Sequence, residues 1–317
     1  MMVSASTDPA LAAALARFDR FAADRQIDVR PDAPLGPMTT LRVGGPADRL
    51  VEPRSRDELL AVLAAVREAE VPWLVIGNGS NLVVADAGVR GVVIRNRARA
   101  VAIDGARLTA DAGAPMALLV KRAAVAGLAG LEWGIAVPGT VGGAVWANAG
   151  AHGGDMGDRL ATVETWDPRS GDLRRLQRAE CAFGYRESRF KHEATVVISA
   201  DLRLEPDDPA AVAERVTAYQ AQRQATQPLA EQNAGSVFRN PPGDHAGSLI
   251  DTAGLKGMRV GTASVSTRHA NFIVTDRGGR AADVRRLAEQ VRSTVRDAAG
   301  IQLEYEIEFV GAWESDR

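Results

Sequence analysis

Glycines that could bind a phosphate group concentrate in residues 134–157 (GIAVPGTVGGAVWANAGAHGGDMG). Eight of these positions are glycine, and no charged side chain comes before Asp155. Without a Cβ atom in the way, backbone N–H groups can line a pocket and hold an anion such as a pyrophosphate. A second segment, residues 75–84 (VIGNGSNLVV), has the same character. Two glycine-rich loops beside apolar strands predict a large phosphorylated cofactor.

The familiar nucleotide-binding motifs do not match these loops. A dinucleotide fingerprint needs G-x-G-x-x-G at the start of a helix. After Gly77 and Gly79, however, the third glycine position is Leu82. The G-x-x-x-x-G-K-[ST] sequence of a P-loop is absent from the chain. A pair of tight turns at strand ends stays open as the alternative, although the second segment is too long for a simple turn.

Composition narrows the class of protein. A chain of 317 residues predicts about two domains, each with its own core. A net charge of −2 gives no sign of a nucleic-acid or membrane surface. The single cysteine, Cys181, excludes an intrachain disulfide and is consistent with a reducing cytoplasm, so we expect a cytoplasmic protein. The four histidines have no metal-ligand spacing, and no metal site is predicted.

The elements that must position these loops alternate between strands and helices. Asp8-Pro9 is typical of a helix start, and residues 55–58 (SRDE) read as a capping box. Apolar patterns predict helices over 56–66, 116–125, 210–224 and 281–299. They predict strands over 49–51, 73–76, 91–94, 98–103, 107–112, 162–166, 173–176, 195–204, 271–275 and 302–310. Residues 206–209 (PDDP) break the composition and indicate a domain boundary, so the pattern is an α+β chain with a large first unit and a smaller second one.

Six pieces of the chain, in this order, carry a family resemblance. They are residues 43–47 (VGGPA), 77–82 (GNGSNL), 138–154 (PGTVGGAVWANAGAHGG), 183–188 (FGYRES), 233–238 (NAGSVF) and 253–257 (AGLKG). Together they resemble the UDP-N-acetylenolpyruvoylglucosamine reductases (UDP-N-acetylmuramate dehydrogenases), flavoproteins of bacterial cell-wall synthesis. The resemblance runs from about Pro37 to Gly311. The short spacing from Phe190 to Pro228 is similar to that of the subgroup without the extra substrate-covering loop.

The resemblance implies an FAD-binding unit of the vanillyl-alcohol-oxidase type plus a smaller α+β substrate domain. Residues 1–36 would be an N-terminal helical segment, 37–205 the FAD-binding domain with subdomains of about 37–97 and 98–205, and 206–317 the substrate domain. It implies a non-covalent FAD and NADPH, with NADPH and the substrate using one site in turn. The implied FAD contacts are Gly77, Asn78, Gly79, Ser80, Asn81, Leu82, Val137, Pro138, Gly139, Thr140, Gly142, Gly143, Asn148 and Gly150.

The implied reaction adds a hydride and a proton to the enolpyruvyl double bond of the UDP-N-acetylglucosamine enolpyruvate substrate. By resemblance, Arg186 is the catalytic arginine, Ser236 the proton donor and Glu306 the catalytic carboxylate. A guanidinium can hold the substrate carboxylate and stabilise an enolate. Local sequence leaves plainer alternatives open: a surface ion pair for Arg186 and a turn for Ser236. Glu306 lies in an alternating run, LEYEIE, whose acids would share one strand face, and such a face is usually solvated.

Four further positions resemble substrate contacts of the family: Tyr185, Arg223, Asn240 and His269. His152 replaces a more usual tyrosine and could contact the substrate, anchor the flavin covalently, or be a solvated loop residue. Cys181 reads as a small packing residue. We expect a monomer that binds a small-molecule substrate and neither nucleic acid nor membrane. Two other functions stay open, an alcohol oxidase of the same flavin superfamily and a catalytically silent nucleotide-binding module.

Overall fold

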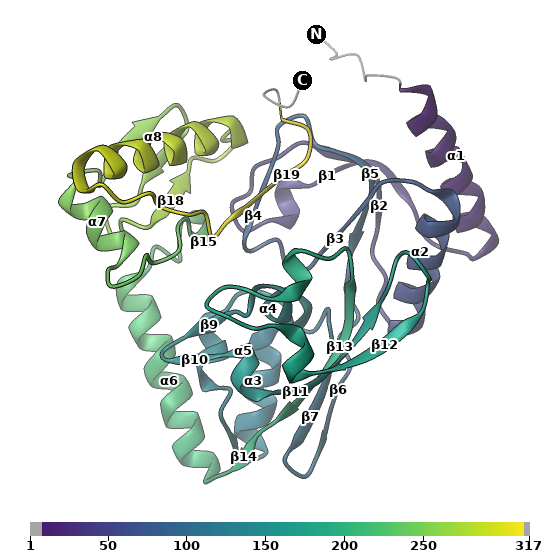
Figure 1. The fold of residues 1–317 in the computed structure, drawn as a ribbon, viewed down its shortest axis with the longest axis horizontal. Coiled ribbons are helices and arrows are strands. Elements are labelled where there is room, and N and C mark those ends of the chain that lie inside the picture. The colour runs from purple at the N-terminus through teal and green to yellow at the C-terminus, as the bar shows by residue number, and fades with distance from the viewer. Residues whose placement is uncertain (1–7, 314–317) are drawn as a thin grey trace.

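The computed structural model describes residues 8–313 and contains three sheets of four or five strands (Figure 1). Residues 1–7 of the predicted N-terminal segment and residues 314–317 of the predicted substrate domain lie outside it. The first sheet has the order β1-β2-β5-β3, with three parallel strands and β1 antiparallel at its edge. Its strands are β1 (Arg30–Pro34), β2 (Pro46–Val51), β5 (Val89–Arg95) and β3 (Trp73–Ile76).

Two helices, α1 (Pro9–Asp24) and α2 (Arg56–Ala69), pack on each other beside this sheet (Figure 1). The predicted starts of both helices are confirmed. The Asp8 carboxylate accepts from the Ala10 N–H at 2.9 Å, and the Ser55 hydroxyl accepts from the Glu58 N–H at 3.2 Å. In a capping box the Glu58 carboxylate would accept from the N–H of Ser55. Here it accepts from the Arg54 N–H instead, so only one half of the predicted capping box is present.

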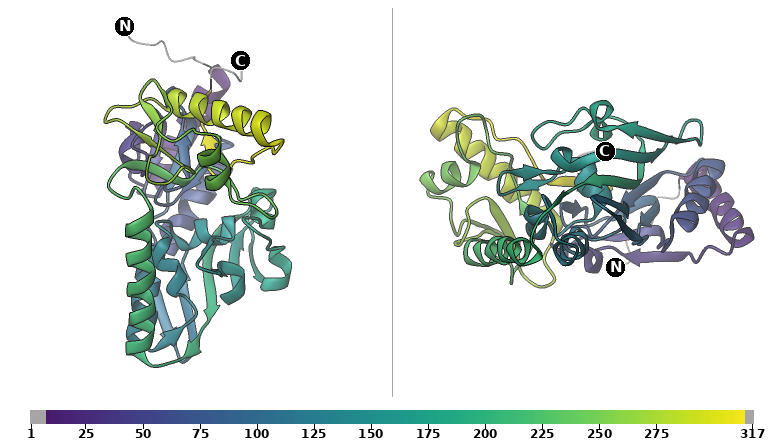
Figure 2. Two further views of the ribbon diagram at one scale, coloured as in Figure 1. Left: turned by 90° about the vertical axis from the view of Figure 1, so that its left-hand side faces the viewer. Right: turned by 90° about the horizontal axis from the view of Figure 1, so that it is seen from below.

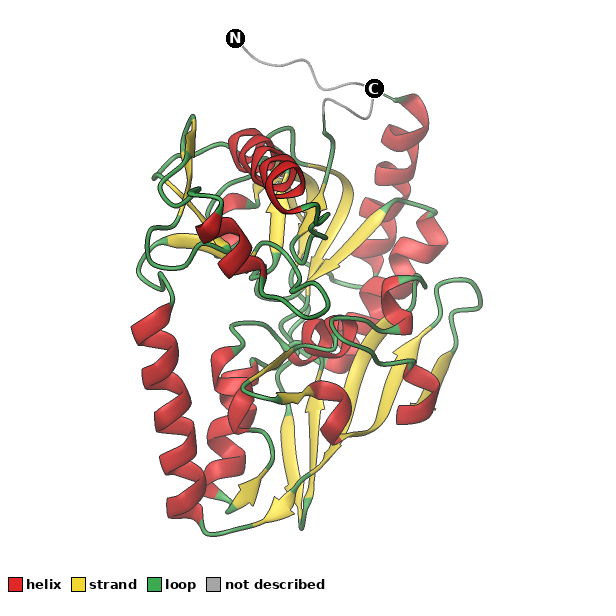
Figure 3. Ribbon diagram, turned by 60° about the vertical axis from the view of Figure 1, so that its left-hand side comes forward, coloured by secondary structure: helices red, strands yellow, loops and turns green. Residues whose placement is uncertain are grey.

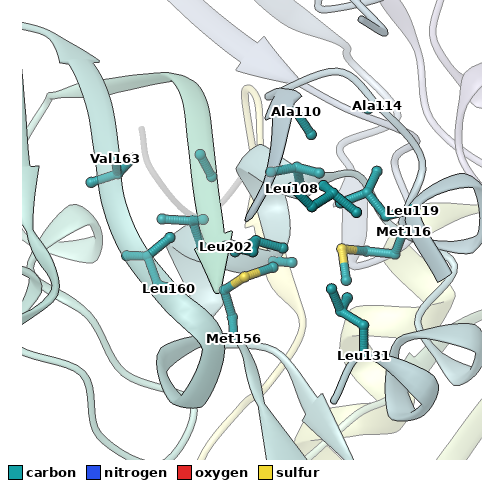
Figure 4. Packing of buried hydrophobic residues seen from close by; sticks show 14 of the residues in the cluster. Leu108, Ala110, Ala114, Met116, Leu119, Leu131, Met156, Leu160, Val163 and Leu202 are labelled. Carbon is teal, nitrogen blue, oxygen red and sulfur yellow. The ribbon is translucent and has the colours of Figure 1, made fainter. Parts of the chain in front are cut away.

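The second sheet is antiparallel, with the order β12-β11-β13-β7-β6. Its strands are β12 (Leu173–Gln177), β11 (Leu160–Trp166), β13 (Val196–Arg203), β7 (Arg107–Asp111) and β6 (Val101–Asp104). The helices α3 (Met116–Val125), α4 (Val141–Ala147) and α5 (Met156–Arg159) contribute to its core. In that core Met116 and Leu119 of α3 meet Leu108 of β7 (Figure 4).

The third sheet is antiparallel, with the order β15-β18-β17-β16, and lies with two helices at one end of the molecule (Figure 3). Its strands are β15 (Gln232–Ser236), β18 (Phe272–Thr275), β17 (Ala263–Val265) and β16 (Arg259–Val260). The helices are α7 (Ala246–Thr252) and α8 (Ala281–Ala299). The helix predicted over 281–299 is confirmed, and α8 buries one face that includes Val284, Leu287, Val291 and Val295.

Helix α6 (Pro209–Thr226) connects the second and third sheets and runs along one side of the molecule (Figure 2). It packs against α3 and the 3-10 helix η2 (Glu132–Ala136), and β14 (Glu205–Pro206) pairs with β8 (Leu128–Ala129). Helix α6 and strand β14 therefore lie beside the second sheet. The domain boundary at residue 206 stays a prediction. The remaining elements are η1 (Gly36–Met38), β9 (Gly150–Ala151), β10 (Gly154–Asp155), η3 (Arg178–Cys181) and η4 (Arg189–Lys191).

The prediction of one continuous strand over 302–310 is wrong. Tyr305 forms a single bridge to Phe238, and only β19 (Glu308–Val310) is a strand. β19 pairs in parallel with β4 (Leu82–Val84), which directly follows the first glycine-rich loop. The chain thus leaves the third sheet near residue 306 and crosses to the first glycine-rich loop, and this change of partner interrupts the strand.

The other strand that differs is 98–103, since β6 begins only at Val101. The Ala98 N–H donates to the Asn96 side chain and the Ala100 N–H donates to the Asp111 carboxylate, so side chains replace the strand pairing there. Among residues 8–313 no helix combines the length and the apolarity that crossing a bilayer requires.

Candidate active site

The two glycine-rich loops lie against each other. The Asn78 side-chain amide donates to the Pro138 carbonyl at 3.0 Å, and a Cβ atom at Gly77 would overlap with the Thr140 hydroxyl. The loops follow β3 and precede α4, so they come from the first and the second sheet. Their contact forms one continuous glycine-rich surface from segments that are 60 positions apart in the chain.

Several backbone N–H groups of this surface are available to an anion. The N–H groups of Asn78, Gly79, Ser80, Gly139 and Thr140 donate no hydrogen bond to any group of residues 8–313. Unpaired backbone N–H groups on neighbouring glycine-rich loops suit a pyrophosphate. The donor set therefore fits the pyrophosphate of FAD, which the sequence predicts at these loops.

Two of the predicted FAD contacts already have hydrogen-bond partners within the protein. The Gly142 N–H donates to the Ala112 carbonyl at 2.8 Å, so it is not free to bind a phosphate. Asn148 is buried, and its side-chain amide bonds to Asp155, to the Gly184 carbonyl and to the Gly157 N–H at 3.0, 2.8 and 2.8 Å. All of these bonds are internal, so the Asn148 side chain shapes the loop and does not face a ligand.

Arg186 lies at the tip of a tight turn. Gly184 and Glu187 exchange two backbone hydrogen bonds, of 3.0 and 3.1 Å, around Tyr185 and Arg186. The backbone of Arg186 has a φ of +54°, a left-handed conformation that residues other than glycine and asparagine rarely adopt. Backbone strain of this kind costs on the order of 1–3 kcal/mol and clusters at functional sites.

The Arg186 guanidinium is held from two sides. Its Nε donates to Glu306 Oε1 at 2.7 Å, and its Nη2 donates to the Gly150 carbonyl at 2.6 Å. Gly150 is one of the predicted FAD contacts, and its carbonyl oxygen accepts from this arginine. Both side chains of the pair are about one fifth exposed, at 20% and 21%. The pair therefore lies at the edge of a site that solvent or a ligand can reach.

Ser236 lies next to this ion pair through the backbone. It ends β15, and the following residue, Val237, accepts from the Glu306 N–H at 2.8 Å. The Asn81 side chain donates to the Glu306 carbonyl at 2.9 Å. The structure thus brings Arg186, Ser236 and Glu306 together beside the first glycine-rich loop, from positions as far as 120 residues apart.

The alternating acids near the C-terminus do not form a uniformly solvated face. The side chains of Glu304, Glu306 and Glu308 are 76%, 21% and 37% exposed. Each has a cationic neighbour, and these are Arg239 at 3.9 Å, Arg186 at 2.7 Å and Lys191 at 3.5 Å. The plain alternative of a solvated acid is therefore correct for Glu304 and wrong for Glu306.

Two predicted substrate residues lie together in a cavity of about 520 Å³. The Tyr185 hydroxyl accepts from the Asn240 N–H at 3.3 Å, and the Arg186 guanidinium lies 5.1 Å from the centre of the Tyr185 ring. The cavity is also lined by Arg239, Pro241, Pro242, Gln302 and Glu304. Arg239 was not among the predicted site residues, and its guanidinium pairs with Glu187 at 3.3 Å.

The other two predicted substrate residues lie outside this cavity. Arg223 of α6 donates to Gln227 at 3.0 Å, and burial lowers the pKa of its guanidinium. His269 precedes β18 and packs edge-on against Phe272, which pairs with Ser236. Burial is the main reason that the pKa of His269 lies below its ordinary value.

His152 stacks on Tyr219 of α6, with ring centroids 4.1 Å apart, beside a cavity of about 210 Å³. Burial lowers the pKa of this histidine. Burial also raises the pKa of Cys181 to about 11, which makes its thiol a weak nucleophile and agrees with the predicted packing role. No group of residues that could hold a metal ion is present within the described part of the chain.

Comparisons with known proteins agree with this geometry. Residues 227–310 match the family model "UDP-N-acetylenolpyruvoylglucosamine reductase, C-terminal domain", and residues 47–177 match "FAD binding domain". A UDP-N-acetylenolpyruvoylglucosamine reductase of Moorella thermoacetica is 45% identical, over 90% of this chain and 94% of its own length. One from Symbiobacterium thermophilum is 44% identical, over 89% and 92%.

A solved structure is similar over nearly the same range. The UDP-N-acetylenolpyruvylglucosamine reductase of Thermus caldophilus matches with a TM-score of 0.76 and 38% identity, and the match covers 89% of this chain and 98% of that chain. The predicted α+β architecture, an FAD-binding domain followed by a C-terminal domain of the reductase family, is therefore confirmed. The loops, the Arg186–Glu306 pair and these relatives lead to one conclusion: the chain belongs to the UDP-N-acetylenolpyruvoylglucosamine reductase family.

Proposed function

We propose that Arg186, Ser236 and Glu306 carry out the NADPH-dependent reduction of the enolpyruvyl group of UDP-N-acetylglucosamine enolpyruvate. The product is UDP-N-acetylmuramate, a precursor of the bacterial cell wall. One observation carries the proposal: the 2.7 Å ion pair of Arg186 and Glu306 lies between the glycine-rich loops and the strand that ends in Ser236. Membership of the family favours this reaction over an alcohol oxidase or a silent nucleotide-binding module.

FAD, when bound, supplies hydride transfer, and the protein supplies binding, orientation and charge. The N–H groups of Asn78, Gly79, Ser80, Gly139 and Thr140 would hold the pyrophosphate. The enolpyruvyl group is a carbon–carbon double bond conjugated to a carboxylate, so reduction at C3 moves negative charge toward that carboxylate. A cationic donor at the carboxylate therefore favours the charged intermediate more than the substrate.

Arg186 is suited to that position. Its Nε and Nη2 atoms are held by Glu306 and by the Gly150 carbonyl, whereas its Nη1 atom donates to no acceptor within residues 8–313. The fixed bonds orient the guanidinium before substrate arrives, so little side-chain entropy is lost when the carboxylate binds. Arg186 thus holds the substrate carboxylate, and Glu306 holds Arg186 and acts on the intermediate.

Ser236 supplies the proton that C2 needs. Its hydroxyl makes no hydrogen bond to any other residue within 8–313, so it is free to donate to substrate. A serine is a weak acid and must be positioned precisely by its surroundings. The pairing of β15 with β18 and the backbone bond between Val237 and Glu306 provide that positioning.

The remaining predicted residues contact the sugar nucleotide in this proposal. Tyr185 and Asn240 border the cavity next to Arg186, and the cation Arg223 faces the diphosphate. His269 supplies a polar contact. The enzyme acts as a cytoplasmic monomer, uses NADPH and substrate at one site in turn, and supports cell shape and division through cell-wall synthesis.

The visible spectrum of the purified protein tests the activity. We expect a yellow protein whose flavin absorbance bleaches with NADPH and returns, without oxygen, when UDP-N-acetylglucosamine enolpyruvate is added. Bleaching by an alcohol but not by NADPH would point to the oxidase class. A colourless protein that cannot be loaded with FAD would contradict the proposal altogether.

A further inference from the structure

Lys191 is a half-buried cation for which the proposed reaction has no role. Its side chain is only 9% exposed, although lysines are rarely buried unless they are paired. The ammonium lies 4.5 Å from the centre of the Trp146 ring and 3.5 Å from Glu308 Oε1. An indole face and a carboxylate both stabilise a desolvated ammonium. Lys191 is therefore held in a site formed by two other segments of the chain.

These two segments belong to the two glycine-rich loops. Trp146 is part of α4, which lies within the second glycine-rich segment, and its carbonyl accepts from the Ser188 hydroxyl at 2.6 Å. Glu308 begins β19, and its N–H donates to the carbonyl of Asn81 in the first loop at 2.9 Å. The Lys191 ammonium therefore links the helix of one loop to the strand attached to the other.

The same segments carry the Arg186–Glu306 pair. Arg186 and Lys191 come from one short stretch, and Glu306 and Glu308 come from another. Glu306 and Glu308 lie on either side of a bend at Ile307, and each carboxylate meets one of the two cations. The outer pair, Lys191 with Glu308, is placed to prevent the stretch at 306–308 from sliding along the stretch at 186–191.

We infer that Lys191 is a positioning residue for this reaction, which acts through Glu308 to hold Glu306 against Arg186. The inference rests on the proposed roles of Arg186 and Glu306. Loss of the ammonium leaves the Glu308 carboxylate without its cation on the stretch at 186–191, so the Arg186–Glu306 pair alone joins the two stretches. A displacement of about 1 Å at a reacting group slows a reaction by about 10²-fold, so the effect appears in the step that Arg186 and Glu306 serve.

The test compares Lys191→Met with Lys121→Met, which removes an exposed lysine on α3. Stopped-flow absorbance separates flavin reduction by NADPH from reoxidation by the enolpyruvyl substrate. We expect Lys191→Met to slow reoxidation by about 10–100-fold at saturating substrate, with reduction nearly unchanged. Lys191→Arg keeps a cation that can stack on Trp146, and restores most of the rate. Lys121→Met behaves as the wild type in both steps.

A double-mutant cycle with Glu308→Gln shows whether Lys191 acts through Glu308. If it does, Glu308→Gln, Lys191→Met and the double variant slow reoxidation by similar factors, so the single effects do not multiply. Multiplying effects, or a Lys191→Met enzyme with a lower thermal midpoint but wild-type reoxidation, would overturn the inference. If Lys191→Met does not fold, Glu308→Gln decides alone, because reoxidation at the wild-type rate excludes the linkage.

Failure of this inference is distinct from failure of the proposed function. If Glu306→Gln leaves reoxidation intact, the assigned role of Glu306 is wrong and Lys191 has nothing to position. If Glu306→Gln slows reoxidation and neither Lys191→Met nor Glu308→Gln does, only the positioning role is wrong. Titration of the oxidised enzyme with substrate provides an independent measurement, and we expect the dissociation constant of Lys191→Met to change less than its reoxidation rate.

Discussion

Arg186 donates a hydrogen bond from Nε to Glu306 Oε1 at 2.7 Å, between residues that are 120 positions apart in the chain. Arg186 comes from the tight turn between β12 and β13 of the second sheet, and Glu306 comes from the stretch between α8 and β19. The same guanidinium binds the carbonyl of Gly150 in the second glycine-rich loop. One arginine thus connects the cofactor loops to the segment beside Ser236.

The first prediction concerns this pair. Glu306→Gln keeps the shape of the side chain but removes its charge, and charge-assisted hydrogen bonds are about twice as strong as neutral ones. We expect reoxidation of the flavin by the enolpyruvyl substrate to slow by about 10²-fold or more, and reduction by NADPH to change much less. Stopped-flow absorbance measures both rates. Glu68→Gln, which removes a surface partner of Arg25, is the matched control, and equal effects of the two variants would contradict the assignment.

The second prediction separates the two half-reactions at Ser236. Because its hydroxyl is assigned only to protonation of C2, Ser236→Ala should leave reduction by NADPH nearly intact. Reoxidation should slow by about 10²–10⁴-fold, the usual range for loss of a positioned proton donor. Ser236→Cys should retain part of the rate, since a thiol can still donate. Reoxidation of Ser236→Ala at the rate of the control Ser293→Ala would show that Ser236 is only a turn residue.

The third prediction is that FAD is bound without a covalent bond. The candidate anchors argue for this, because the Cys181 thiol is buried with a pKa of about 11 and the His152 ring is stacked on Tyr219. Acid precipitation followed by centrifugation should leave the yellow colour in the supernatant. Colour in the pellet, together with its loss in His152→Ala, would instead identify a covalent link at that histidine.

The fourth prediction concerns the order of the substrates. If NADPH and the sugar nucleotide use one site in turn, initial-rate plots at several fixed concentrations of one substrate should give parallel lines, as in a ping-pong mechanism. Each substrate should also inhibit at high concentration by occupying the site meant for the other. Lines that intersect at every concentration would mean that both substrates bind at once.

The fifth prediction concerns acid stability. The Asp201 carboxylate is buried in the second sheet and accepts hydrogen bonds from Arg107, Thr109 and Thr162. Burial alone would raise the pKa of Asp201, but these bonds outweigh it and hold the pKa below its ordinary value. A carboxylate with a lowered pKa stabilises the fold above its unfolded-state pKa of about 4, and this contribution is lost as pH falls through the folded-state value.

Asp201→Asn should therefore lower the free energy of unfolding at neutral pH by about 1–3 kcal/mol. Its stability should then fall less than that of the wild type between neutral and acidic pH, because the titrating group is gone. Urea unfolding at several pH values measures both quantities. Asp104→Asn, which changes an exposed carboxylate at the end of β6, should follow the wild-type curve. An unchanged pH dependence in Asp201→Asn would contradict this account.

The sequence by itself determined the local features of the structure, which depend only on residues close together in the chain. The N-caps Asp8 and Ser55, the buried stripe of α8 and the two glycine-rich loops follow from local geometry, so they were predictable. The family, and with it the architecture and the reaction, followed from six short motifs in a fixed order, because the matching pieces extend over most of the chain.

The tertiary structure alone decided which polar groups already have hydrogen-bond partners within the protein. Asn148 and the Gly142 N–H read as ligand contacts in the sequence, yet their hydrogen bonds are made within the protein. Alternation along residues 303–308 placed three acids on one side but could not tell whether that side faces water or cations. Only the crossing of the chain from the third sheet to β4 brings Glu306 to Arg186 and Glu308 to Lys191. Contacts between residues more than 100 positions apart depend on the whole fold, and no local pattern encodes them.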